Sequence, residues 1–310
     1  MEITAAMVKE LREMTGAGVM ACKKALVETD GDYDKAIEVL REKGEATAVK
    51  KAGRIAAEGT VLAVVKEDKT AAIVEVNSET DFVAKNDKFR TYVANVAEQV
   101  LATRATDVEA FMDEKWMLDE SKTVKEELVS QIAVIGENMS IRRFVKINSD
   151  GVVVPYIHAG GRIGVLVEAD TTVINDEVKE CLKNVAMQIA ALNPKYTSRD
   201  EVSEDFIAHE KEILMAQIKN DPKEASKPEK VIEGMINGRI NKEMKEICLL
   251  DQVYVKAEDG KQSVANYVAE VAKATGSGLK IKGFVRYETG EGIEKKSENF
   301  AEEVAKQMNQ

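Results

Sequence analysis

The stretch that decides the fold is residues 75–86, which read EVNSETDFVAKN. Its first residues end a short apolar, β-branched run from Ala71 to Val76, and such a run predicts a buried strand. From Asn86 the pattern becomes helical, because apolar residues recur at spacings of three and four: Phe89, Val93, Val96 and Val100. The sequence therefore predicts a strand, a turn and a helix in this order.

The turn places Phe82 directly after Asp81, between Thr80 and Lys85. Two interpretations of this phenylalanine stay open. Aromatic side chains mostly lie in cores, so composition alone favours a ring that folds back onto its own subdomain. A strand-to-helix turn lies at a domain rim, however, where the ring could be presented to another molecule.

Composition limits the classes of function. The chain has 310 residues, of which 44% are hydrophobic and 32% charged, and this suits an ordinary protein of two or more domains. It has no apolar run of about 20 residues and no signal-peptide pattern, so we expect a cytoplasmic protein without membrane contact. Its three separated cysteines argue against disulfides, and its net charge of −11 argues against general nucleic-acid binding.

Residues 1–54 predict a small three-helix domain. Two glycines separate the first two helices at Thr15-Gly16-Ala17-Gly18, and Asp30-Gly31-Asp32 separates the second from the third. The third helix is predicted to end at Gly44, with the basic run from Lys50 to Arg54 as a linker. About 40 residues give a thin core, which favours a docking role.

Residues 55–147, and residues 148–195 together with 249–289, predict two related core subdomains, each a hairpin followed by a helix. The helix end NVAEQVLA at residues 95–102 is echoed by NVAMQIAA at residues 184–191. Each hairpin is led by a glycine, Gly59 or Gly151, and the second has His158 at its tip. In the second subdomain we also expect a strand over Gln252–Val255.

Residues 196–248 predict an antiparallel coiled-coil hairpin that protrudes from the core. Two helices are expected, Asp200–Asn220 and Pro228–Ile247, joined at Asp221-Pro222-Lys223. Narrow apolar stripes mark them: Phe206, Ile213 and Ile218 on the first, and Ile232, Ile236, Ile240 and Ile247 on the second. Two roles stay open for this hairpin: it is a solvated spacer, or it contacts a partner or a second copy of the chain. Residues 290–310 predict a C-terminal module whose helix carries Phe300 and Val304.

Motifs for catalysis are missing from the sequence. There is no Walker loop, G-x-G-x-x-G, H-E-x-x-H or G-x-S-x-G, and the histidines are His158 and His209 alone. We expect neither an enzyme nor a bound cofactor or metal. The class is α+β.

Two stretches carry a resemblance to a known family. Residues 11–26, LREMTGAGVMACKKAL, and residues 75–85 resemble the two signatures of bacterial elongation factor Ts. Residues 156–158 (YIH), residues 162–167 (RIGVLV) and residues 290–295 (GEGIEK) are similar to further family segments. Departures are Met14 and Ala21, where Arg and Asp are common, and Ala159-Gly160, which lengthens the tip after His158.

The resemblance implies an exchange factor that binds elongation factor Tu, GDP-bound and nucleotide-free, and releases GDP during translation elongation. It implies a ubiquitin-associated-like first module and the coiled-coil insertion. The residues that match the family's partner-binding positions, which disturb the Mg²⁺ and phosphate sites of elongation factor Tu, are Thr80, Asp81, Phe82, Val83 and His158. Those of the secondary contact are Lys9, Arg12, Thr15, Gly16, Ala17, Gly18 and Lys23.

Two other functions compete with exchange. The charged hairpin at residues 196–248 suits a structural or chaperone-like binding module, with a second copy of the chain as one candidate partner. A hydrolase would have to be built around His158, which has no Ser or Cys motif beside it.

Overall fold

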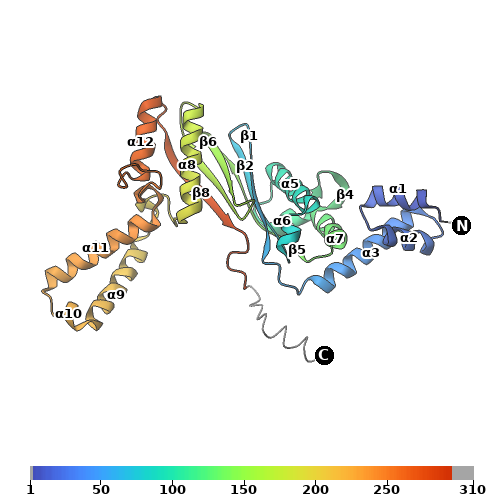
Figure 1. Cartoon of the computed structure of the whole chain (residues 1–310), viewed down its shortest axis with the longest axis horizontal. Helices are drawn as coiled ribbons and strands as arrows, with labels where there is room; N and C mark the ends of the chain where they lie inside the picture. The colour runs from blue at the N-terminus through green and yellow to red at the C-terminus, as the bar shows by residue number, and fades with distance from the viewer. Residues whose placement is uncertain (1–2, 295–310) are drawn as a thin grey trace.

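The computed structural model describes residues 3–294, and the predicted helix with Phe300 and Val304 lies outside the described residues. The fold mixes helices with antiparallel sheets, which confirms the α+β class. Figure 1 shows an elongated molecule with the sheets in the middle, three N-terminal helices at one end and a helical hairpin at the other. Among residues 3–294 no helix is both long enough and apolar enough to cross a membrane.

Three helices form the N-terminal end: α1 (Ala5–Thr15), α2 (Val19–Glu28) and α3 (Tyr33–Lys51). Gly16 ends α1 in the left-handed conformation at φ 68°, which glycine adopts without strain. The prediction that α3 ends at Gly44 is wrong, and Lys50 and Lys51, expected in a linker, are the last residues of this helix. An interior glycine costs only about 1 kcal/mol, and the packing of the second half of α3 against α7 (Val124–Ile135) outweighs it.

The first sheet has the strand order β1-β2-β5 and is antiparallel throughout. Its strands are β1 (Glu58–Lys66), β2 (Thr70–Ser78) and β5 (Met139–Asn148). Ala72, Val74 and Val76 of β2 face a core built with α5 (Asp87–Ala102). The same core takes side chains from α6 (Val108–Asp113), α7 and the short β3 (Lys115–Trp116), which pairs with β4 (Asp119–Thr123). Trp116 is buried there.

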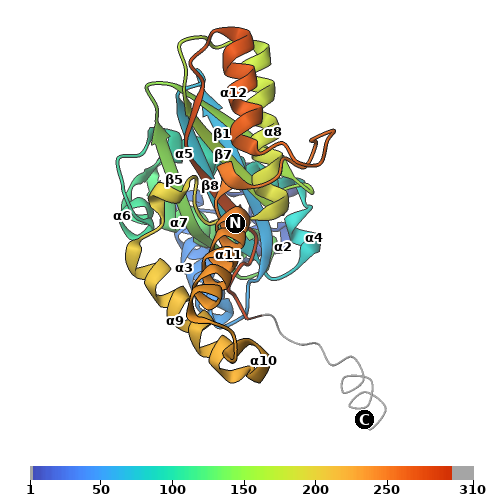
Figure 2. The same cartoon turned by 90° about the vertical axis from the view of Figure 1, so that its left-hand side faces the viewer.

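The second sheet has the strand order β6-β7-β8. Its strands are β6 (Val152–His158), β7 (Ile163–Asp170) and β8 (Lys280–Glu288). Two helices, α8 (Asp176–Leu192) and α12 (Val264–Thr275), share a core with β6, β7 and the start of β8. Figure 2 shows α8 and α12 side by side.

The two sheets pack against each other through their inner faces. Alternate residues of β1 and β2, such as Val61 and Ile73, meet Val153, Leu166 and Tyr287 of the second sheet in one buried cluster. β2 is therefore covered on both faces, which explains why its apolar run is continuous.

The two hairpin-plus-helix units share a detail that the sequence echo did not reveal. Gln99 of α5 donates to the carbonyl of Lys115 (3.0 Å) and accepts from the N–H of Met117 (2.7 Å). Gln188 of α8 makes the same pair of bonds, to the Val253 carbonyl (3.0 Å) and from the Val255 N–H (2.8 Å). Each glutamine is buried and fixes an extended segment across its helix.

The strand predicted over Gln252–Val255 is wrong. Only Val253 makes an isolated bridge, to Ser263. Two backbone bonds flank this bridge, from the Tyr254 N–H to the Gln262 carbonyl (2.8 Å) and from the Val264 N–H to the Gln252 carbonyl (3.0 Å). The chain then turns, with the Ala257 N–H donating to the Tyr254 carbonyl (2.9 Å), so the pairing does not extend into a strand.

The helices α9 (Glu204–Asn220) and α11 (Glu229–Ile247) run side by side as a hairpin, with the one-turn α10 (Pro222–Ala225) at its tip (Figure 2). Single 3₁₀ turns, η1 (Arg199–Glu201) and η2 (Leu249–Asp251), lie at the base. Helix α9 begins later than predicted, because Ser203 caps it by accepting from Phe206 N–H.

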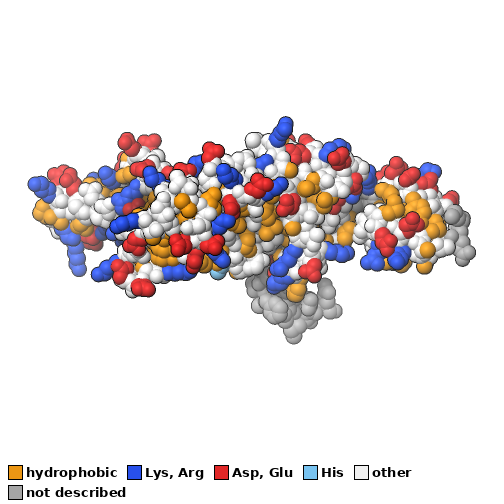
Figure 3. Space-filling model, turned by 90° about the horizontal axis from the view of Figure 1, so that it is seen from above, with side chains coloured by type: hydrophobic (Ala, Val, Ile, Leu, Met, Phe, Trp, Pro, Cys, Tyr) orange, Lys and Arg blue, Asp and Glu red, His pale blue; other side chains and the backbone are white. Residues whose placement is uncertain are grey.

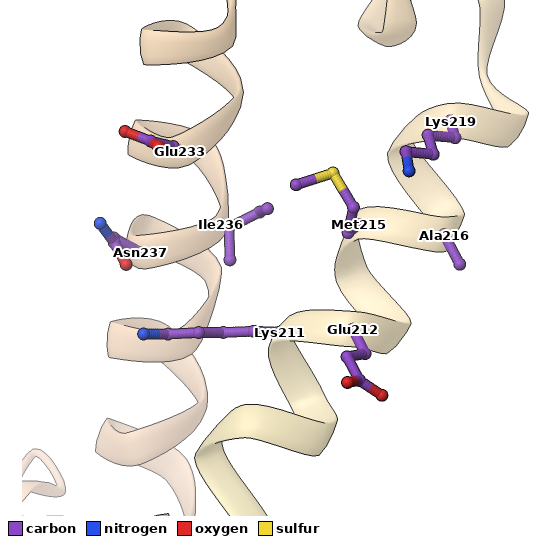
Figure 4. A pocket seen from close by; sticks show the side chains of 8 residues that line it. All are labelled: Lys211, Glu212, Met215, Ala216, Lys219, Glu233, Ile236 and Asn237. Atoms are coloured by element: carbon purple, nitrogen blue, oxygen red, sulfur yellow. The ribbon is translucent and has the colours of Figure 1, made fainter.

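The apolar seam of this hairpin differs from the predicted stripe at one position. Ile213 is exposed, whereas Leu214 and Met215 pack beside Ile218 and Ile236. Figure 4 shows Met215 and Ile236 pointing toward each other across the two helices. Both line an open groove of about 680 Å³.

Candidate functional site

The turn after β2 is a single helical turn, α4 (Asp81–Ala84). Thr80 caps it in extended backbone, and its hydroxyl accepts from the Val83 N–H at 3.3 Å. The Phe82 side chain stands outside with 82% of its surface exposed. The interpretation that Phe82 fills its own core is therefore wrong.

The reason lies in helical geometry, because successive side chains in α4 point about 100° apart. Val83 packs against the core of the first sheet, so it takes the inward position that Phe82 would need. Phe82 is the most exposed large hydrophobic side chain among the described residues.

A carboxylate from a distant loop holds the beginning of this turn. Glu137, between α7 and β5, accepts from the backbone N–H groups of Glu79 and Thr80, each at 3.1 Å. Its other oxygen accepts from the Thr80 hydroxyl at 2.7 Å. In return Glu79 accepts from the Asn138 N–H at 2.6 Å, so the two segments are bonded in both directions.

Charge is placed on the outer side of α4. The Lys85 ammonium donates to the Asp81 carboxylate at 2.6 Å, and this bond lowers the pKa of Asp81 below its ordinary value. Both side chains remain more than half exposed. Asp81 is therefore an ionised, accessible group directly beside the Phe82 ring.

His158 lies at the end of β6 and is exposed, as the tip position predicted. Its Nδ1 is 3.1 Å from the Tyr156 hydroxyl. The loop that follows is anchored through the Gly161 carbonyl, which accepts from the Val61 N–H at 2.7 Å and the Thr289 hydroxyl at 3.0 Å. The backbone at Gly160 and Gly161 has positive φ, 66° and 105°, so the lengthened tip is a defined turn.

The structure brings the Phe82 turn and the His158 tip together through Arg90. The Arg90 Nε donates to the carbonyl of Ala84, the last residue of α4, at 3.2 Å. A Cβ added to Gly160 would lie 3.9 Å from the Arg90 Nη2, so the guanidinium also borders the tip. Arg90 therefore borders both the α4 turn and the loop that follows His158.

The N-terminal candidates lie elsewhere. Lys9, Arg12, Gly16, Gly18 and Lys23 are exposed and Thr15 and Ala17 half-buried, on α1, α2 and the turn between them. Helix α3 separates this end from the sheets (Figure 1). Exposed apolar side chains lie here as well, at Met14, Val19, Met20 and Val27. Figure 3 shows hydrophobic side chains on the surface at this end of the molecule.

Sequence reasoning missed Glu137, Asn138 and Arg90. The first two follow Gly136, which ends α7 in the left-handed conformation, and that helix-stop glycine was the signal that a defined loop begins there. Nothing local indicated that this loop bonds to the Phe82 turn. Among the described residues no group of three or more His, Cys, Asp or Glu side chains is arranged to hold a metal ion.

Comparison with known proteins decides the family. The family model described as Elongation factor TS matches residues 79–291, which is more than half of the chain. The chain belongs to the elongation factor Ts family. It is 52% identical over 307 residues to elongation factor Ts of Clostridioides difficile (strain 630), with 99% of each chain covered. It is 54% identical over 308 residues to elongation factor Ts of Clostridium botulinum (strain Eklund 17B / Type B), again with 99% of each covered.

Membership of the elongation factor Ts family has a functional consequence. It implies a nucleotide exchange factor that acts on elongation factor Tu in translation elongation. The matched segment begins at Glu79 and so contains the whole Phe82 turn, Arg90, Glu137 and the His158 tip.

Proposed function

We propose that this chain binds elongation factor Tu·GDP and promotes GDP release by inserting Asp81 and Phe82 between helices of the partner's nucleotide domain. The insertion disturbs the Mg²⁺ and phosphate sites there. The observation that carries the proposal is the exposed Phe82 ring on an ordered, capped turn. An ordered turn loses little conformational entropy on binding, so most of the burial energy of the ring stabilises the distorted partner.

Phe82 needs help from other contacts. Exchange through a ternary complex is reciprocal, so this chain weakens GDP binding by the same factor by which GDP weakens binding of this chain. A thousandfold weakening corresponds to about 4 kcal/mol, whereas burying one phenylalanine side chain contributes about 1.5–3 kcal/mol. His158, whose loop borders Arg90 as the Phe82 turn does, supplies a second contact in this proposal, toward the phosphate-binding loop.

The N-terminal helices supply a third contact, as a ubiquitin-associated-like docking module. Lys9, Arg12, Lys23 and the Thr15–Gly18 turn form the polar part of this contact, and the exposed Met14 and Met20 support an apolar part. The separation of this module from the Phe82 turn fits a partner gripped at several points. The α9–α11 hairpin, as a coiled-coil insertion, offers a further contact to elongation factor Tu or to a second copy.

The decisive experiment measures the release of a fluorescent GDP analogue from elongation factor Tu. The intact chain should accelerate release in a concentration-dependent, saturable way, and excess Mg²⁺ should oppose it. If the intact chain binds elongation factor Tu but leaves the release rate unchanged, the proposal fails.

A further inference from the structure

We propose that Glu137 is the positioning residue that aims Phe82, a role that rests on the proposed function above. Glu137 lies 55 residues beyond Phe82 in the chain and reaches the turn from the loop between α7 and β5. Its hydrogen bonds go to Glu79 and Thr80, ahead of Phe82 in the chain. It acts on Thr80, the residue from which α4 begins.

The bonding pattern is specific for a carboxylate. All three groups that point at Glu137 are donors: the N–H of Glu79, the N–H of Thr80 and the Thr80 hydroxyl. A carboxylate is purely an acceptor and can take all three, whereas the carboxamide of glutamine presents one oxygen and one donating nitrogen. Bonds to a charged acceptor are also about twice as strong as neutral ones.

The Thr80 hydroxyl connects this anchor to the helix. It donates to Glu137 and at the same time accepts from the Val83 N–H, so its rotamer and the start of α4 are set together. A four-residue helix has little stability of its own, because nucleation is unfavourable. The direction of the Phe82 ring therefore depends on this cap, and the cap depends on Glu137.

Loss of the anchor should lower the fraction of molecules whose turn is aligned. When a partner binds only the aligned state, the apparent dissociation constant rises by the inverse of that fraction. We expect Glu137→Ala to raise the half-saturating concentration for GDP release about tenfold, while saturating concentrations restore the maximal rate. Glu137→Gln should fall between wild type and Glu137→Ala.

The test is a double-mutant cycle in the fluorescent-GDP assay, with full-length Phe82→Ala, Glu137→Ala and the double variant. Glu126→Gln is the matched control, because Glu126 caps the other end of the same helix, α7, without touching the turn. The control should lose some thermal stability and keep the wild-type half-saturating concentration. Without Phe82, Glu137→Ala should change GDP release less than twofold.

Two results would overturn the inference. One is a Glu137→Ala effect of the same size with and without Phe82, since Glu137 would then act elsewhere. The other is an unchanged half-saturating concentration in a folded Glu137→Ala protein. If Glu137→Ala does not fold, Glu137→Gln takes its place in the same cycle. If Phe82→Ala loses activity but the Glu137 variants behave as wild type, this inference fails and the proposed function stands. If the intact chain does not accelerate GDP release, the proposed function itself fails.

Discussion

Replacing Phe82 with alanine should separate activity from stability. Because 82% of the side chain is exposed, its removal takes almost nothing from the core, and the change in the free energy of unfolding should stay within about 0.5 kcal/mol. In the complex the same ring becomes buried, and losing that burial costs about 1.5–3 kcal/mol. This corresponds to a fall in GDP-release efficiency of about 10- to 150-fold.

The assay is stopped-flow release of fluorescent GDP from elongation factor Tu at subsaturating concentrations of this chain, beside a thermal melt. Leu118→Ala is the matched control, since Leu118 is 62% exposed in the turn between β3 and β4 and takes no part in the proposed contact. The reasoning is refuted if Phe82→Ala releases GDP within twofold of wild type. It is refuted equally if the variant melts several degrees lower, because the ring would then serve the fold.

Two further predictions concern stability. Glu75 is fully buried and accepts from Arg142, Arg143, Asn77 and the Gly290 N–H; although burial raises its pKa, these bonds outweigh burial and hold the pKa below the ordinary value of 4.5. Glu75→Gln should lower the free energy of unfolding by about 2–4 kcal/mol at pH 7, toward the lower end because both guanidiniums stay about 30% exposed. A carboxylate whose pKa is lowered in the folded state stabilises the fold above its unfolded pKa, and this stabilisation is lost as pH falls through the folded pKa. In denaturant titrations, the difference in unfolding free energy between wild type and Glu75→Gln should therefore shrink below about pH 4.5. A difference that grows there would contradict this. Gln99→Leu and Gln188→Leu should each cost about 1–3 kcal/mol, because each leaves one half-buried carbonyl and one half-buried N–H without a side-chain partner. Amide hydrogen exchange should rise at Met117 in the first variant and at Val255 in the second; unchanged protection would show that the side-chain bonds do not hold these segments.

Local periodicity was enough to predict much of the fold. Phe89, Val93, Val96 and Val100 gave α5 nearly to the residue, and all four are buried. The continuous apolar run of β2 predicted a buried strand because both of its faces are covered. In these elements the residues that determine the structure are neighbours in the chain.

Two of the failures share the opposite property. Helix α3 continues past Gly44 because α7, some 80 residues later, packs against it. The strand expected at Gln252–Val255 is reduced to one bridge, to Ser263, because the chain turns directly after it. The outward direction of Phe82 follows from Val83 taking the core position. The outcomes at α3 and Phe82 depend on tertiary partners that no local pattern encodes.

The same limit applies to the candidate site. The turn and the exposed tip were predicted from their own residues. The bond from Arg90 to the turn and the bonds from Glu137 to Thr80 join segments that no local pattern connects, and only the structure shows them. The sequence indicated the two segments separately, and the structure shows that Arg90 borders both.

The central claim is that the Phe82 ring enters elongation factor Tu during exchange, and cross-linking tests it most directly. A photoreactive benzoylphenylalanine at position 82 should cross-link to the nucleotide domain of elongation factor Tu, with a yield that falls as GDP is added, because the two ligands oppose each other. A complex that forms without cross-links from position 82, or with a yield indifferent to GDP, would contradict the account.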